Sequence, residues 1–229
     1  MRDDEKSPNV GGLIKIELAA DGVISNRLID EINLACDQAQ DAGPGAVLAV
    51  RLAAGKKETS LFQAGGHADV HLLSQWERAL QRIEKLPIPT LAVLQGDCFG
   101  LMTEILLTTD FRIASADSRI GLARVGETLW PSMAIHRLVA QIGSAHARPA
   151  VLLGIDWSAA AALSVGLVNK VSHDVDACAD AHMHFCTQAK VADLGIRRRL
   201  LLEATSTTHE QALGVHLAAC DRALRASNV

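Results

Sequence analysis

The chain of 229 residues is 49% apolar and 21% charged, which predicts one well-packed globular domain and excludes a disordered chain. Its 22 basic and 26 acidic side chains give a net charge of −4, which argues against a nucleic-acid-binding face. The five cysteines are odd in number and none is spaced as CxxC, so a disulfide scaffold or a zinc ribbon is disfavoured. The sequence shows no secretory signal and no apolar run of about 18 residues, so we expect a cytoplasmic protein that does not enter a membrane.

Strand and helix patterns alternate through the first part of the chain. Residues 12–18 alternate apolar and polar positions, which predicts an edge strand. Ser25 is placed to cap the next helix, which should end at the glycine and proline turn of residues 42–45. Residues 46–52 form a short apolar run that is typical of a strand buried on both faces.

The remaining pattern predicts more strands first and then mainly helices. A helix over 76–86 carries Trp76, Ala79, Leu80 and Ile83 on one side. After it we expect a buried strand over 90–94, a helix over 102–109, strands over 111–114, 119–122 and 167–171, and helices elsewhere after Pro131. We therefore predict an α/β fold with a helical C-terminal part. Its expected divisions are a flexible N-terminus (1–11), an α/β core (12–190) and a C-terminal helical region used for oligomerisation (191–229).

The segment 88–110 is the densest candidate for chemistry. A buried strand ends in a glycine turn, and a helix should start just after Gly100, with Glu104 in its first turn. The first N–H groups of a helix have no partners within the helix, so they can face a ligand oxygen. An N–H donor beside a carboxylate suits a reaction that builds negative charge on a carbonyl while a proton moves. The alternative is that Glu104 only complements the helix dipole on a wet surface.

Several motifs resemble the crotonase, or enoyl-CoA hydratase/isomerase, superfamily. The glycine turn and helix match its strand-(N/Q)G-xxx-GGG-x-E run, followed by Thr109-Asp110. The stretch 152–171 is similar to the family's L-(T/S)-G…A-x-x-A-x-x-x-G-L-V pattern, and the resemblance extends over residues 13–213. It implies a crotonase-like ββα superhelix and an acyl-CoA substrate. No separate cofactor is implied, because coenzyme A is part of that substrate.

The resemblance also assigns catalytic roles. Two backbone N–H groups polarise the thioester carbonyl in this family, and they match Gly66 and Leu101 here. The first family glutamate matches Glu104, whereas the position of the second is Arg124. A guanidinium cannot act as a general base. Arg124 could instead hold a substrate carboxylate or phenolate, pair with Glu104, or form a structural salt bridge.

A single carboxylate can still perform a syn elimination, in which it removes the α-proton and delivers it to the departing β-hydroxyl. Glu104 would then need a pKa raised toward neutrality by desolvation, whereas its place at the start of a helix acts in the opposite direction. Glu127 could be a displaced second acid. Trp130 could shape the acyl pocket or fill the core.

Basic side chains and histidines add further candidates. Arg197 and Arg198 match the family's basic C-terminal helix and could contact CoA phosphates, or lie on a solvated face. His67 stands where the family's loop has aspartate, and it forms an i, i+4 pair with His71. No HExxH-type motif supports that pair, so we expect no metal.

Four stretches are similar to a narrower subgroup, the small DpgB-like crotonase homologues. They are residues 76–87, 96–114, 127–138 and 216–227. These homologues assist a type III polyketide synthase that makes 3,5-dihydroxyphenylacetyl-CoA, a precursor for glycopeptide antibiotics. This narrower resemblance implies dehydration and aromatisation of a polyketide thioester. The resemblance to the superfamily implies homo-oligomers that are trimers or hexamers. The alternative is a non-catalytic subunit that binds the synthase or a sister crotonase.

Overall fold

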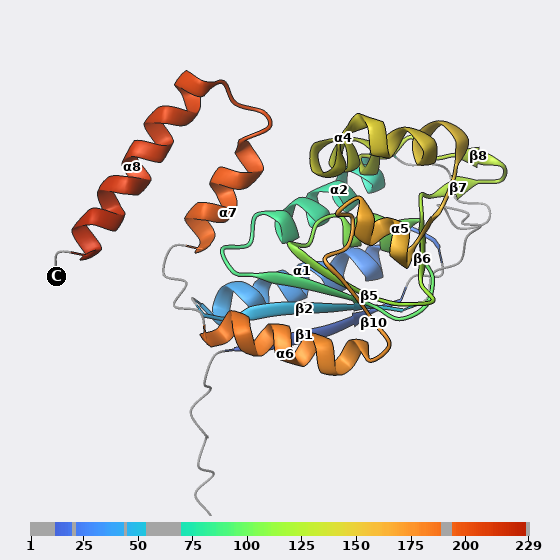
Figure 1. Cartoon of the computed structure of the whole chain (residues 1–229), viewed down its shortest axis with the longest axis horizontal. Coiled ribbons are helices and arrows are strands. Elements are labelled where there is room, and N and C mark those ends of the chain that lie inside the picture. Colours follow the sequence, from blue (N-terminus) through green and yellow to red (C-terminus); the bar gives the residue numbers. More distant parts are fainter. Residues whose placement is uncertain (1–11, 20–21, 44, 54–69, 189–193, 228–229) are drawn as a thin grey trace, which may run out of the picture.

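A computed structural model describes residues 12–19, 22–43, 45–53, 70–188 and 194–227 (Figure 1). Its central layer is a five-stranded parallel sheet in the order β1-β2-β3-β5-β10. The strands are β1 (Leu13–Leu18), β2 (Val47–Leu52), β3 (Thr90–Leu94), β5 (Phe111–Ser115) and β10 (Lys170–Ser172). Strand β1 lies at one edge with alternating exposure, and β3 is buried throughout, as the sequence predicts. None of the described helices is long and apolar enough to cross a membrane.

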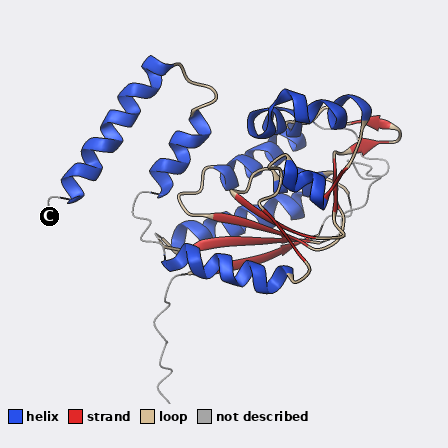
Figure 2. Cartoon of the chain, viewed as in Figure 1, coloured by secondary structure: helices blue, strands red, loops and turns tan. Residues whose placement is uncertain are grey.

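Helices cover both faces of this sheet (Figure 2). Helices α1 (Asn26–Asp41) and α2 (Val70–Glu84) share a core with Leu48 and Val50 of β2. Helix α6 (Val175–Gln188) packs instead on Val47 and Ala49, which point to the opposite face of the same strand. Because both faces are covered, the central strands read as continuous apolar runs.

Several short elements lie beyond the carboxyl ends of the strands. A three-stranded sheet joins β4 (Cys98–Phe99), β6 (Arg119–Gly121) and β9 (Trp157–Ser158), and helix α3 (Leu101–Leu106) follows β4 directly. A hairpin pairs β7 (Arg124–Val125) with β8 (Thr128–Leu129). Gly121 allows β6 to lie close to β4, since a Cβ at this position would lie 2.7 Å from the Phe99 ring.

Three predicted boundaries are wrong, each for a local reason. Helix α2 begins at Val70 rather than at residue 76, because Leu72 and Leu73 are half-buried against the main core and extend its apolar side by a further turn. Helix α3 ends at Leu106, where the Thr108 and Thr109 hydroxyls bond carbonyls of its last turn. Strand β10 starts at Lys170 rather than at residue 167, because Leu167 and Val168 are buried in the bend that precedes it.

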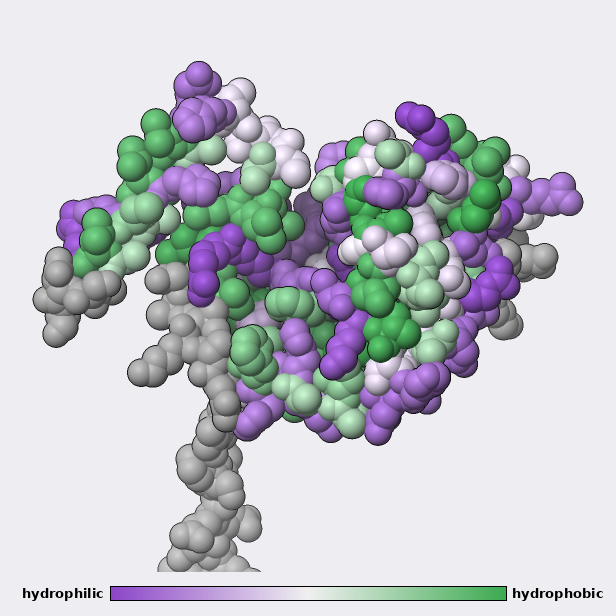
Figure 3. All heavy atoms as spheres, viewed as in Figure 1, coloured by the Kyte–Doolittle hydropathy of each residue, from purple (hydrophilic) through white to green (hydrophobic). Residues whose placement is uncertain are grey.

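The C-terminal third is mainly helical. Helix α4 (Ala134–Leu153) is kinked at Gly143, whose φ of 76° departs from helical geometry, and α5 (Ala159–Ser164) follows β9. Helices α7 (Leu194–Glu203) and α8 (His209–Ser227) extend to one side of the molecule (Figure 1). Figure 3 shows apolar residues at the surface of this part of the molecule. The exposed leucines of the two helices are Leu201, Leu202, Leu213, Leu217 and Leu224. Cys220 on α8 is exposed, whereas the other four cysteines are buried.

Candidate active site

Glu104 lies in the first turn of α3 and is only 3% exposed. The turn before the helix uses Gly100 at a φ of 62°, a conformation that favours glycine. The Thr103 hydroxyl lies 3.0 Å from the Cys98 carbonyl and 2.7 Å from that of Gly121, which ties the start of α3 to β4 and β6. The alternative of a solvated, dipole-complementing Glu104 is therefore wrong, because the helix is buried on all sides.

The two carboxylate oxygens of Glu104 have different surroundings. Oε2 accepts a hydrogen bond from the Trp76 indole Nε1 at 2.7 Å. Oε1 is buried and has no hydrogen-bond partner among the described residues. A buried unpaired carboxylate oxygen is costly, and such groups gather where a substrate supplies the missing partner.

Burial raises the pKa of Glu104 above its ordinary value. The Trp76 N–H, the Ser132 hydroxyl and the Arg137 charge act in the opposite direction, while the charge of Glu77 adds to the increase. Desolvation therefore has the largest effect on the pKa of Glu104, a question that the sequence alone left open. A raised pKa is the property that a carboxyl group needs to accept and return a proton near neutral pH.

Leu101, the predicted oxyanion donor, is the first residue of α3 and is 1% exposed. Its N–H belongs to the group of first-turn amides that have no acceptor within a helix. Its side chain packs into the main core, so the substitution of a family glycine by leucine is accommodated there. The other predicted donor, Gly66, lies outside the described residues, as does His67.

Arg124 performs a structural task at the end of another helix. Its Nη2 donates to the carbonyl of Gly154, the C-cap of α4, where a cation complements the helix dipole. Gly154 is required for this approach, since a Cβ there would lie 2.3 Å from Nη2. Arg137, and not Arg124, is the cation whose charge lowers the pKa of Glu104. This argues against the pairing of Arg124 with Glu104, one of the three roles that the sequence left open.

Comparison with known proteins identifies the family of the chain. A family model described as enoyl-CoA hydratase/isomerase matches residues 13–219. The chain belongs to this family. An "Enoyl-CoA-hydratase" of Amycolatopsis orientalis is 38% identical over 215 residues, which cover 92% of this chain and 96% of the relative. Processing of acyl-CoA thioesters, as a lyase or an isomerase, is the activity of the family.

Solved structures confirm the crotonase fold. An enoyl-CoA hydratase from Bacillus anthracis has a TM-score of 0.78 at 22% identity, covering 91% of this chain and 86% of that one. An enoyl-CoA hydratase/isomerase from Cupriavidus metallidurans has a TM-score of 0.77 at 18% identity, covering 94% and 86%. At these identities the likeness concerns the fold alone.

The other described candidates are not among the groups that bond Glu104 or shift its pKa. Glu127 is exposed in the turn between β7 and β8. Trp130 is half-buried against the main core, and its backbone N–H donates to the Ala123 carbonyl at 2.8 Å. His71 is exposed on α2, with its Nε2 3.1 Å from the Gln75 amide nitrogen.

The expected CoA-phosphate contact of Arg198 is wrong, because this side chain is buried inside the crotonase domain. Its Nε lies 2.6 Å from Oδ1 of Asp110, and its Nη2 lies 3.0 Å from the Ile83 carbonyl. A further bond reaches the Leu86 carbonyl. Arg198 thus attaches α7 to the core, whereas Arg197 is exposed and remains a candidate for phosphate.

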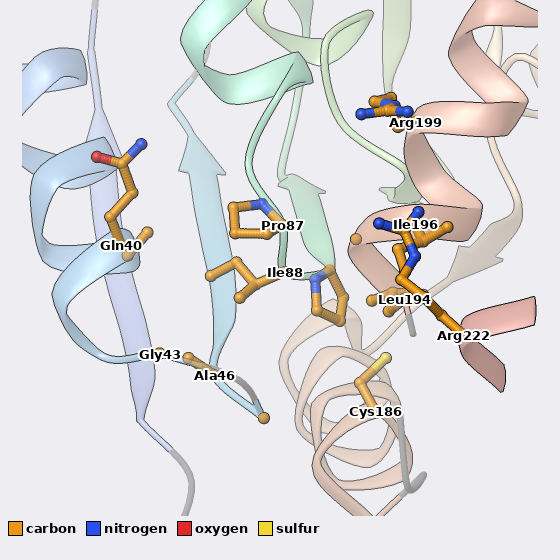
Figure 4. Close-up of a pocket in the computed structure, with 14 residues that line it drawn as sticks. Gln40, Gly43, Ala46, Pro87, Ile88, Cys186, Leu194, Ile196, Arg199 and Arg222 are labelled. Atoms are coloured by element: carbon orange, nitrogen blue, oxygen red, sulfur yellow. The ribbon is translucent and has the colours of Figure 1, made fainter. Parts of the chain in front are cut away.

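A cavity of about 470 Å³ opens between α7, α8 and the core (Figure 4). Figure 4 shows Gln40 and Ala46 on one side, with Ile196 and Arg222 on the other. The cavity adjoins Pro89, which precedes β3, whereas Glu104 follows the opposite end of that strand. It is therefore separate from the catalytic candidates of this crotonase.

Sequence reasoning missed three groups around the family glutamate: Trp76, Ser132 and Arg137. Arg137 is buried, with its Nε 2.7 Å from Glu84 Oε1 and its Nη1 3.2 Å from Glu77 Oε2, so it joins α4 to α2. Those two carboxylates outweigh burial and raise the pKa of Arg137. The available signal for Trp76 was its place on the apolar side of a helix, because a buried indole N–H needs an acceptor.

Proposed function

We propose that this crotonase dehydrates a polyketide-type CoA thioester, with Glu104 as its single acid/base. The carrying observation is the buried Glu104 carboxylate, in which one oxygen is hydrogen-bonded and the other is unpaired among the described residues. A carboxyl group in this state can take up a proton at one oxygen and release it again.

The reaction needs one proton carrier and one oxyanion site. The Leu101 N–H, with that of Gly66, binds the thioester oxygen as negative charge develops there. One such donor contributes about 2.7–4 kcal/mol to stabilising the transition state. The Glu104 carboxylate removes the α-proton, and the electron pair of the Cα–H bond forms the enolate. The carbon–oxygen bond at Cβ then breaks, Glu104 returns its proton to the leaving hydroxyl, and water departs from the enoyl thioester.

The choice of a polyketide substrate rests on Arg124 and on the DpgB-like stretches. Because Arg124 stands in the place of the second glutamate and bonds Gly154, ordinary two-carboxylate hydration is not supported. Loss of water from a cyclised polyketide thioester needs only one carboxyl group and leads to an aromatic ring. We therefore assign the product class of 3,5-dihydroxyphenylacetyl-CoA, with a type III polyketide synthase supplying the substrate.

One observation favours the second candidate, an accessory subunit that binds the synthase or a sister crotonase. Helices α7 and α8 expose five leucines in the described part of the chain, on a surface suited to a protein contact. The same surface supports a homo-oligomer, a trimer or a hexamer. In both proposed functions the protein binds an acyl-CoA thioester.

Mass spectrometry of thioester turnover tests the proposal. Wild type and Glu104→Gln would be compared on 3-hydroxyacyl-CoA and enoyl-CoA, and on malonyl-CoA together with a type III synthase. We expect the wild type to change the products and E104Q to lose that effect while keeping its circular dichroism spectrum. If both proteins change the products equally, Glu104 is not the acid/base, and the accessory function takes its place.

A further inference from the structure

The indole of Trp76 meets the carboxylate of Glu104 across 28 residues of sequence, and both side chains are buried. Trp76 sits on the inner face of α2 beside Ala79, Leu80 and Ile83, and is itself 2% exposed. A side chain packed in this way has one orientation, so its N–H direction is fixed by the core.

We propose that Trp76 is the positioning residue for Glu104, and that it assigns proton transfer to Oε1 by holding Oε2 as a permanent acceptor. This inference rests on the proposed function and names which oxygen performs it. An indole nitrogen only donates, so Oε2 must accept whether Glu104 is charged or neutral. The hydroxyl oxygen of a carboxylic acid is the poorer acceptor, so the neutral acid carries its hydrogen on Oε1.

The charged groups around Glu104 leave Trp76 as its direct anchor. On α2, Glu77 raises the pKa of Glu104. From the side of α4, the Ser132 hydroxyl and the Arg137 charge lower it. Arg137 is itself held between Glu77 and Glu84. On α3 the neighbours are uncharged, and the Thr103 hydroxyl is engaged by the Cys98 and Gly121 carbonyls. The short bond to Glu104 comes from the Trp76 indole.

A nitrogen-15 NMR titration tests the bond without relying on turnover. The chain has three tryptophans, so its spectrum holds three indole signals: Trp76, Trp130 and Trp157. We expect one signal to move with pH, with a midpoint above the ordinary glutamate pKa of about 4.3. In E104Q that movement should disappear. If no indole signal follows Glu104 in the wild type, or if one moves equally in E104Q, the proposal is overturned.

Kinetics of Trp76→Phe separate positioning from packing, because phenylalanine keeps an aromatic ring and removes the N–H donor. We expect kcat to fall on the order of tenfold to a hundredfold, as for loss of a hydrogen bond to a charged group, with KM nearly unchanged. The rising limb of the pH–rate profile should move to higher pH, because a group that lowers the pKa of Glu104 is gone.

The matched control is Trp157→Phe in β9, which should keep both kcat and the pH limb of the wild type. If the rising limb of the pH–rate profile of W76F lies at the same pH as that of the wild type, the proposal is overturned. Failure of the proposed function would look different. In that case E104Q would retain turnover, while the Trp76 signal still followed the titration of Glu104. If W76F does not fold, comparison of the wild-type and E104Q titrations decides alone.

Discussion

Arg198 on α7 reaches the carboxylate of Asp110 from 88 residues further along the chain, with its Nε 2.6 Å from Oδ1. Asp110 also accepts the backbone N–H of Thr90 at 2.8 Å. One carboxylate thus fastens both the start of β3 and the first C-terminal helix to the core.

Replacing this arginine should destabilise the fold strongly. Arg198→Met leaves the Asp110 carboxylate and two carbonyls without their donor, and removing one partner of a buried ion pair costs about 3–5 kcal/mol. Urea denaturation measures the loss. The matched control is Arg197→Met, whose exposed side chain should change the free energy of unfolding by about 0.5 kcal/mol or less. Equal stabilities of the two variants would show that Arg198 is not an anchor.

Two glycines at positive φ should respond differently to alanine. Gly154→Ala places a Cβ against the Arg124 guanidinium, whereas Gly126→Ala meets nothing within 4 Å. We expect G126A to cost about 1 kcal/mol from backbone strain alone, and G154A to cost about 1–3 kcal/mol more, because Arg124 must leave the Gly154 carbonyl. Thermal denaturation of both variants checks this order. A G154A protein as stable as G126A would contradict the described contact.

The stability of the protein should depend on pH through Glu104. Burial raises its pKa in the native state, so between about 4.3 and that raised value the native protein binds more protons than the unfolded chain. Stability contributed by this group is therefore lost as the pH rises through that window. E104Q has no such loss, so the melting temperature of E104Q minus that of wild type should increase with pH and then level off.

The control for this experiment is Glu210→Gln, an exposed position on α8. Its melting temperature should run parallel to that of the wild type over the same range. A difference between E104Q and wild type that stays constant with pH would show that Glu104 titrates as an ordinary glutamate.

Restoring the family's second glutamate should not create a hydratase. Arg124→Glu removes the donor to the Gly154 carbonyl and puts a negative charge at the C-terminal end of α4, where the dipole disfavours it. We expect a loss of stability of about 1–3 kcal/mol and no increase in hydration of enoyl-CoA. Arg124→Gln, which keeps a donor without the charge, serves as the comparison. A gain of hydration in R124E would mean that the position still faces the substrate.

The sequence predicts the inner strands and α1 well, because burial on both faces and a capping serine leave strong local patterns. Ser25 does cap α1, with its oxygen 3.3 Å from the Leu28 N–H. The same local reasoning places Glu104 in the first turn of a helix. It cannot tell whether that turn is wet or buried, because the answer depends on β4, β6 and α2 closing around it.

The errors among the candidate site residues concern long side chains whose partners lie far away in sequence. A run of three arginines at 197–199 is compatible with CoA-phosphate contacts or with a solvated face, and only the fold brings Asp110 to the middle one. Arg124 on β7 likewise contacts the C-terminal end of α4, a helix that starts only ten residues later in the sequence. Such contacts are decided by tertiary packing, which a linear pattern does not contain.

The exposed thiol on α8 makes the state of that helix measurable. All five cysteines belong to the described residues, and four of them are shielded by the core, where burial raises the pKa of Cys36 to about 11 and of Cys98 to about 12. A maleimide dye should therefore label Cys220 fastest in the native chain, ahead of Cys186, which is buried but lines the cavity in Figure 4. The labelling rate would then report directly whether another protein covers α8.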